Sequence, residues 1–225
     1  MKTQFFKLLL ITMTISLASC KKENKIVFTD FKYADKPDAM TCGDMDTKLL
    51  KEALYSFEDD IINHYDTQNR NTSRAYTRLI TESIINRLKI EDVISEHTVK
   101  VFEALKQNED LWNIDGGANH LNYNSQVVNC IADNINNQRI KSTFNALKQT
   151  NSLTPKLIGE PIKSSSAQLI NDKYLATFVA LQYYYNKLFD IDLTTILFDK
   201  PEASNVDFNK RPPATQPNTQ NNTNN

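Results

Sequence analysis

Residues 166–189 read "SAQLINDKYLATFVALQYYYNKLF", and this stretch carries a broad apolar face. Its apolar side chains recur at intervals of three or four residues, which places them together on an α-helix. They are Leu169, Tyr174, Leu175, Phe178, Leu181, Tyr185 and Leu188. A helix that is apolar around much of its circumference is typical of an element enclosed by others. We therefore expect a helix over about 166–189 at the centre of a helical bundle.

Five earlier segments of the chain show the same helical period, each with an apolar stripe. Candidate N-caps precede the first two, namely Asp44 or Asp46 and then Thr72 or Ser73. The stripes consist of Leu50, Leu54, Phe57, Ile61 and Tyr65; of Tyr76, Leu79, Ile80, Ile84 and Leu88; of Ile90, Ile94, Val101 and Leu105; of Val127, Cys130, Ile131 and Ile135; and of Ile140, Phe144 and Leu147.

The segments between the stripes are expected to connect helices. Residues 113–126, "NIDGGANHLNYNSQ", form a loop around two glycines, and residues 151–166, "NSLTPKLIGEPIKSSS", form a Pro/Gly connector. "DLTTILF", residues 192–198, adds a last turn or two. The sequence thus predicts an all-α protein, a single bundle of six to seven helices over 46–200. A helical-repeat arrangement of helix pairs is the alternative.

The two flanks of this domain differ from it in composition. Residues 20–45 lack a helical period, and Pro37 and Gly43 interrupt them, so we expect an extended tether whose far end is fixed by packing. Residues 201–225 are rich in proline, asparagine and threonine with almost nothing to bury, and we expect a disordered tail.

The overall composition suits a globular body and excludes one class of partner. Hydrophobic residues make up 40% of the chain, which is enough for a core, and the formal net charge is −1. A nucleic-acid-binding protein is expected to carry a clustered basic face. We therefore expect no nucleic-acid partner.

The first 19 residues have the three parts of a secretory signal peptide. Lys2 and Lys7 form a positive lead, Leu8 to Ala18 form an apolar run of 11 residues, and small residues follow. As a helix this run is about 16 Å long at 1.5 Å per residue. The hydrocarbon core of a bilayer is ~30 Å thick, so the run is too short for a transmembrane helix.

The end of this peptide, Leu17-Ala18-Ser19-Cys20, resembles the lipobox of bacterial lipoproteins. The resemblance implies that the Cys20 thiol carries diacylglycerol, that the peptide is cut before Cys20 and that the new amine is acylated. It covers only these residues and implies nothing about the domain. The alternative is a plain signal peptide cut near Ser19, with Cys20 a free thiol.

The residues after Cys20 bear on the destination of such a lipoprotein. No aspartate follows Cys20 directly, so the inner-membrane retention signal of some Gram-negative lipoproteins is missing. We therefore expect the outer membrane. Some lipoproteins reach the cell surface through an acidic patch after the cysteine, and Glu23 alone is acidic here, so both the periplasmic and the surface side stay open. Lys21, Lys22 and Lys25 favour anionic head groups, or simply begin a solvated linker.

Two cysteines remain once Cys20 is assigned to lipid. Cys42 lies in the tether and Cys130 in the fourth helix. An even pair in an oxidising compartment favours a disulfide. The alternative is two unrelated buried thiols.

Three residues form the candidate polar site. His64 lies near the apolar stripe of the first helix with Asp60 one turn before it, and His97 lies between Ile94 and Val101. Histidine and carboxylate side chains on facing helices can bind a metal or act as acid and base. The alternative is a pair of histidines with hydrogen-bonded neighbours, since a metal-binding motif such as His-Glu-x-x-His is missing.

The glycine loop and the tyrosine run are two further candidates. The loop residues Asp115, Gly116, Gly117, Asn119 and His120, after Trp112, either present backbone groups to a ligand or only connect helices. In "QYYYNK", residues 182–187, three successive tyrosines cannot share one helix face because each residue turns by about 100°. Tyr183 and Tyr184 therefore either pack against a second layer or form an exposed aromatic surface.

The function predicted from these observations is non-enzymatic. The sequence lacks a Gly-x-Ser-x-Gly elbow and a glycine-rich phosphate loop, and no cofactor is indicated. We expect a membrane-tethered module that binds another envelope protein or supports an assembly. The alternatives are a metal-binding protein or enzyme centred on Asp60, His64 and His97, and a small-ligand carrier whose pocket is lined by Tyr174, Phe178 and Tyr185.

Overall fold

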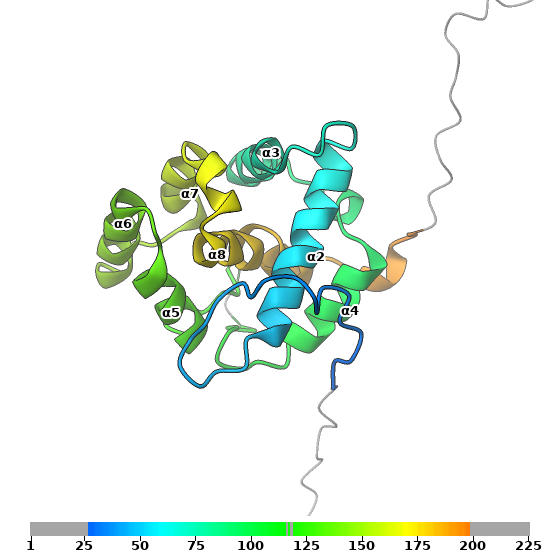
Figure 1. The fold of residues 1–225 in the computed structure, drawn as a ribbon, viewed down its shortest axis with the longest axis horizontal. Coiled ribbons are helices and arrows are strands. Elements are labelled where there is room, and N and C mark those ends of the chain that lie inside the picture. Colours follow the sequence, from blue (N-terminus) through cyan, green and yellow to red (C-terminus); the bar gives the residue numbers. More distant parts are fainter. Residues whose placement is uncertain (1–26, 116, 118, 199–225) are drawn as a thin grey trace, which may run out of the picture.

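A computed structural model describes residues 27–115, 117 and 119–198, and within these ranges the protein is all-helical, without a β-strand (Figure 1). This confirms the predicted fold class. The α-helices of the described part are α2 Lys48–Tyr65, α3 Thr72–Ile84, α4 Glu96–Leu105, α5 Gln126–Asn134, α6 Gln138–Gln149, α7 Pro155–Lys163 and α8 Lys173–Tyr183. The 3₁₀ helices are η1 Ile90–Asp92, η2 Ser166–Ile170, η3 Tyr185–Asp190 and η4 Leu193–Thr195.

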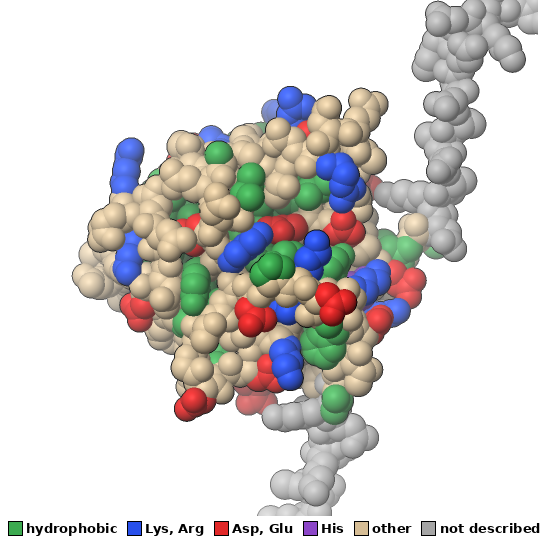
Figure 2. Space-filling view, in the orientation of Figure 1, with side chains coloured by type: hydrophobic (Ala, Val, Ile, Leu, Met, Phe, Trp, Pro, Cys, Tyr) green, Lys and Arg blue, Asp and Glu red, His purple; other side chains and the backbone are tan. Residues whose placement is uncertain are grey.

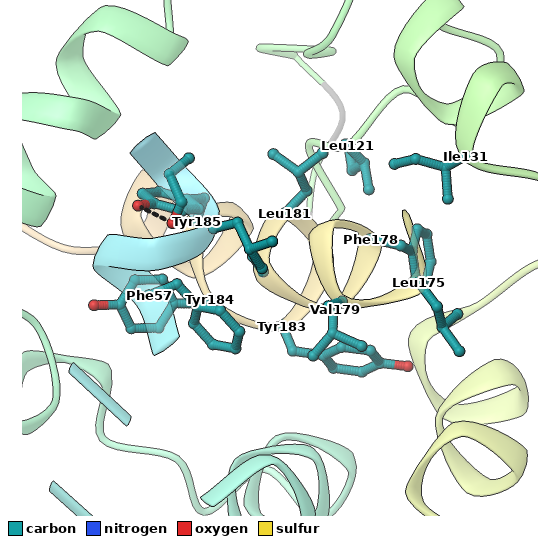
Figure 3. Packing of buried hydrophobic residues seen from close by; sticks show 14 of the residues in the cluster. Phe57, Leu121, Ile131, Leu175, Phe178, Val179, Leu181, Tyr183, Tyr184 and Tyr185 are labelled. Atoms are coloured by element: carbon teal, nitrogen blue, oxygen red, sulfur yellow. Dashed lines mark hydrogen bonds between the residues drawn. The ribbon is translucent and has the colours of Figure 1, made fainter. Parts of the chain in front are cut away.

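Helix α8 lies at the centre of the bundle, as its broad apolar face predicts. Every residue from Leu175 to Tyr183 is buried. Helices α2, α3 and α5 all contact α8, and in Figure 1 it lies among the other helices. Figure 3 shows side chains of other elements, such as Phe57 and Ile131, arranged around it. Burial on all sides explains why α8 lacks a polar stripe.

The predicted helix 166–189 is three helices rather than one. The Asp172 side chain accepts a hydrogen bond from the Leu175 N–H at 3.1 Å and thereby caps the start of α8. Tyr184 ends α8 with φ −124° and ψ −72°, and 3₁₀ helix η3 follows. Tyr183, Tyr184 and Tyr185, which span this change of geometry, are all buried. Of the two alternatives for Tyr183 and Tyr184, packing against a second layer is confirmed and an exposed aromatic surface is ruled out.

The third predicted stripe is also divided. Residues from Ile90 to Leu105 form the short helix η1 and then α4, instead of one helix. The division occurs at Ser95, whose hydroxyl accepts the Thr98 N–H at 3.2 Å as the N-cap of α4. Helix α3 is capped by Asn71, which corrects the predicted cap at Thr72 or Ser73.

The predicted connector at 151–166 contains helix α7, which corrects the expectation drawn from its prolines and glycine. Pro155 occupies the first turn, where a missing N–H removes no helical hydrogen bond. Gly159 is needed for close packing, because a Cβ atom there would lie 2.7 Å from Ile84 Cδ1. Both residues therefore fit a helix at this position.

The segment before α2 runs across the surface of the bundle, and we call its described residues, 27–45, the N-terminal strap. Ala39 and Met40 are buried, and the Tyr174 hydroxyl hydrogen-bonds both the N–H and the carbonyl of Thr41. Cys42 then forms the predicted disulfide with Cys130 of α5, with the two Cα atoms 5.8 Å apart. The signal peptide (1–19), Cys20 and the predicted tail (201–225) lie outside the described residues.

Candidate functional site

Asp60 is a buried carboxylate on α2 that joins three elements. Its Oδ2 atom accepts the Ser95 N–H at 2.9 Å and the hydroxyl groups of Thr98 and Tyr184. Burial raises the pKa of Asp60 above its ordinary value, and these hydrogen bonds oppose the rise. The site thus holds an acidic side chain in a fixed orientation.

The polar cluster around Asp60 extends further into the core. The Thr98 and Ser56 hydroxyl groups lie 2.8 Å apart, and the Tyr185 hydroxyl donates to the Ala53 carbonyl at 3.0 Å. Figure 3 shows the rings of Tyr184 and Tyr185 near Phe57. Burial, together with the Asp60 carboxylate, raises the pKa of Tyr184 well above its ordinary value, so its hydroxyl stays a neutral donor. These contacts connect α2, α4 and the end of α8.

Asp60 and His64 line the same surface hollow, which has a volume of about 390 Å³. His64 is exposed and its ring packs edge-on against Tyr65, with ring centroids 4.6 Å apart. Asp92 and Glu96 add two carboxylates to the lining, and Phe198 completes it. The sequence spacing of four residues therefore brings two of the three candidate residues together.

His97 points to a different place. It is buried, its Nε2 atom lies 2.7 Å from Oε1 of Glu52, and its Nδ1 atom lies 3.7 Å from Oδ2 of Asp30. Glu52 also accepts the N–H groups of Lys32 and Tyr33 at 2.7 and 3.0 Å. His97 thus fixes the N-terminal strap and does not line the hollow with Asp60.

Glu52 and Asp30 were not predicted from the sequence. The hydrogen-bond partners of Glu52 lie 20 and 45 residues away along the chain, so local periodicity cannot reveal them. Among the residues the structure describes, no group of three or more histidine, cysteine or acidic side chains is arranged to hold a metal ion.

The described part of the glycine loop is attached to the end of the central helix. The Asn186 side chain accepts the N–H groups of His120 and Leu121 at 2.7 and 3.1 Å. The His120 ring stacks on Phe189 with centroids 4.6 Å apart, and Asn119 accepts a hydrogen bond from Gln182 at 3.0 Å. These contacts favour a structural role for the loop; Gly116 lies outside the described residues.

The three residues proposed to line a ligand pocket face different neighbours. Tyr174 bonds to Thr41, the Phe178 ring packs edge-on against Phe144, and Tyr185 donates to Ala53. They therefore do not converge on a common cavity.

A second hollow of about 480 Å³ lies between α6 and α7. Leu157 contributes an apolar side chain that is 53% exposed, next to Ile140 and Pro161. Arg139 and Glu160 supply charges of both signs at the same place. The lining thus combines apolar and charged side chains, and both kinds occur in protein-binding surfaces.

Comparison with known protein families, with curated proteins and with solved structures gives no match to this chain. In the described part of the chain, none of the helices combines the length and the apolarity needed to cross a bilayer.

Proposed function

We propose that this protein is a cell-envelope lipoprotein whose helical body is a protein-interaction or structural module. The observation that carries the proposal is the tetrapeptide Leu17-Ala18-Ser19-Cys20, placed directly after a short apolar run. The Cys42–Cys130 disulfide supports it, because stable disulfides are typical of oxidising compartments outside the cytosol.

The anchor follows from the chemistry of lipidation. Each buried methylene contributes about 0.8 kcal/mol, and a single acyl chain binds only reversibly. Two or more chains on Cys20 give lasting attachment. The residue directly after Cys20 is Lys21 and not an aspartate, which supports the outer membrane as the destination.

The internal contacts support binding rather than catalysis. The carboxylates of Asp60 and Glu52 are engaged by donors from the core and the strap, as is Nε2 of His97. The hollow between α6 and α7 instead presents Leu157 and charges at the surface. We assign this hollow to contact with another envelope protein.

Membrane fractionation of Cys20→Ala tests the anchor. We expect the wild-type protein in the membrane pellet after a carbonate wash and the variant in the soluble fraction. Leu197→Ala, at an exposed side chain, is the control, because it keeps Cys20 and the disulfide. Retention of Cys20→Ala in the pellet, or an unmodified amino-terminal thiol in the mass spectrum, would contradict the proposal.

Crosslinking in intact envelopes tests the interaction role. We expect a discrete crosslinked partner for the wild-type protein and its loss with Leu157→Asp, which places a charge in the hollow. Leu197→Asp is the control, because Leu197 lies outside this hollow and its side chain is 79% exposed. Equal crosslinking of both variants and the wild type would exclude this hollow.

The hollow shared by Asp60 and His64 favours a second candidate function, binding of a small polar ligand, or of a metal ion that takes most of its ligands from solvent because the described side chains do not form a group of three. Metal analysis of the purified body tests the metal version. A stoichiometry near zero rules it out, and a full equivalent that disappears in His64→Ala supports it.

A further inference from the structure

The described chain begins with an apolar edge formed by Val27, Phe28 and Phe31. Val27 is 79% exposed and Phe31 is 37% exposed. The rings of Phe28 and Phe31 pack edge-on with centroids 4.9 Å apart. Figure 2 shows apolar side chains at the lower edge of this face, beside the point where the described residues begin.

This apolar edge is held firmly on the body. The next two residues, Lys32 and Tyr33, donate their N–H groups to the buried Glu52 carboxylate. The Phe28 ring lies 6.2 Å from the ring of the buried His97. The edge is therefore a fixed part of the surface of the bundle.

The charges around the edge do not oppose a lipid surface. Lys100 Nζ lies 3.8 Å from Asp30 and 3.3 Å from Glu96, so this group keeps one negative charge in excess. Lys32 adds an exposed positive charge. The positive charge of Lys32 offsets this excess, and the resulting neutral surroundings do not repel anionic head groups.

Chain length limits how far the edge can lie from the lipid on Cys20. The seven steps from Cys20 to Val27 span at most about 25 Å in any conformation. A compact body of this size has a diameter of about 40 Å. The edge therefore stays near the bilayer, while the opposite side of the body cannot reach it.

The geometry points to a membrane-facing surface: Val27 and Phe31 contact the head-group region of the bilayer that holds Cys20. This inference rests on the proposed lipid anchor. It assigns a lipid surface as the partner of the apolar edge and orients the body, with the hollow between α6 and α7 directed away. In Figure 1, α7 and the start of the described chain are on opposite sides of the picture.

Tryptophan fluorescence in vesicles tests the inference with the full-length lipidated protein. Phe31→Trp places a reporter in the edge, and Leu157→Trp places a matched reporter on α7. The single native tryptophan, Trp112, is buried and gives both variants the same background. The vesicles contain phosphatidylcholine and phosphatidylglycerol, with or without brominated acyl chains that quench nearby tryptophan. Val27→Trp repeats the test if Phe31→Trp changes the unfolding midpoint.

We expect blue-shifted, quenched emission from Phe31→Trp and unchanged emission from Leu157→Trp. Equal quenching of the two reporters in protein that sediments with the vesicles would overturn the inference and leave the anchor intact. Failure to sediment would overturn the anchor, and the inference with it. Shielding of Phe31→Trp only after addition of envelope proteins would assign the edge to a protein partner instead.

Discussion

Nε2 of His97 lies 2.7 Å from Oε1 of Glu52, and this contact joins α4 to α2 beneath the N-terminal strap. The same carboxylate accepts the backbone N–H groups of Lys32 and Tyr33. One buried acidic side chain therefore holds two helices and the start of the strap together.

Replacement of this carboxylate is expected to loosen the strap. Glu52→Ala leaves the His97 ring and two backbone N–H groups without their acceptor, which lowers the free energy of unfolding by about 3 kcal/mol. Hydrogen exchange at the amides of Lys32 and Tyr33 should accelerate more than exchange in α8. Urea unfolding and exchange mass spectrometry measure the two effects.

Two variants calibrate this prediction. Glu52→Gln keeps one acceptor oxygen, so its effect should lie between those of the wild type and Glu52→Ala. Asp30→Asn removes an exposed partner of His97, and we expect a change below about 1 kcal/mol. Equal stabilities of Glu52→Ala and Asp30→Asn would contradict the role assigned to Glu52.

The raised pKa of Asp60 predicts a specific dependence of stability on pH. Burial favours the protonated form in the folded protein, so folding binds a proton between the ordinary aspartate pKa and the raised one. The contribution of Asp60 to the free energy of unfolding therefore falls as the pH rises through this window. Asp60→Asn lacks this dependence, so the stability of the wild type minus that of the variant should decrease with rising pH.

Urea titrations of both proteins from pH 3 upward measure this difference, and other carboxylates cancel because both proteins contain them. Tyr184→Phe is a useful companion, because it removes one donor to Asp60 and keeps the ring. A difference that increases with pH would show that hydrogen bonding outweighs burial at this carboxylate.

Gly159 provides a test of packing against helix propensity. Gly→Ala in a helix is expected to stabilise by about 1 kcal/mol from propensity alone. Here the new Cβ would lie 2.7 Å from Ile84 Cδ1 and 2.8 Å from the Tyr183 hydroxyl, which is itself bonded to the Pro155 carbonyl. We expect Gly159→Ala to lower the free energy of unfolding by about 1 to 3 kcal/mol.

Ile84→Val is the matched background for this test, because it deletes the Cδ1 atom that the new methyl group meets. The loss caused by Gly159→Ala should be smaller in that background, as measured by urea unfolding of the four proteins. If Gly159→Ala lowers the free energy of unfolding equally in both backgrounds, the contact with Ile84 Cδ1 is not the source of the strain.

Removal of the disulfide is expected to destabilise the body strongly. The bond closes a loop with a sequence separation of 88 residues. Loss of such a constraint lowers the free energy of unfolding by about 4 to 5 kcal/mol in the chain-entropy treatment. Cys42→Ser/Cys130→Ser and the reduced wild type should agree in urea unfolding. A stability equal to that of the oxidised protein would contradict this expectation.

Much of the fold could be predicted from local patterns. The three- and four-residue spacing of apolar side chains located the long helices, and the even pair Cys42 and Cys130 indicated the disulfide. The division of the third stripe at Ser95 was missed, because the stripe continues across a capping residue. The sequence pattern does not indicate helix α7, because prolines and glycine usually interrupt helices, whereas the close approach of Gly159 to Ile84 involves a segment far away in sequence.

Local spacing predicts one part of the candidate site, the pair Asp60 and His64, but not the place of His97. Asp60 and His64 lie four residues apart on one helix, so their shared hollow follows from the helical repeat. The partner of His97 could not be predicted, since Glu52 lies 45 residues earlier and meets it only after α2 and α4 pack. Contacts that depend on tertiary packing leave no local signal.

The crosslink at Cys42 also sets a mechanical limit. A pull on the amino-terminal end of the strap would load the contacts of Phe28 and Asp30 and then the hydrogen bonds from Lys32 and Tyr33 to Glu52. Detachment could then proceed residue by residue as far as Cys42, where the covalent bond to α5 arrests it. A body tethered in this way can lose the contacts of residues 27–41 while its helices stay folded, because the disulfide at Cys42 keeps the force from reaching α2 along the backbone.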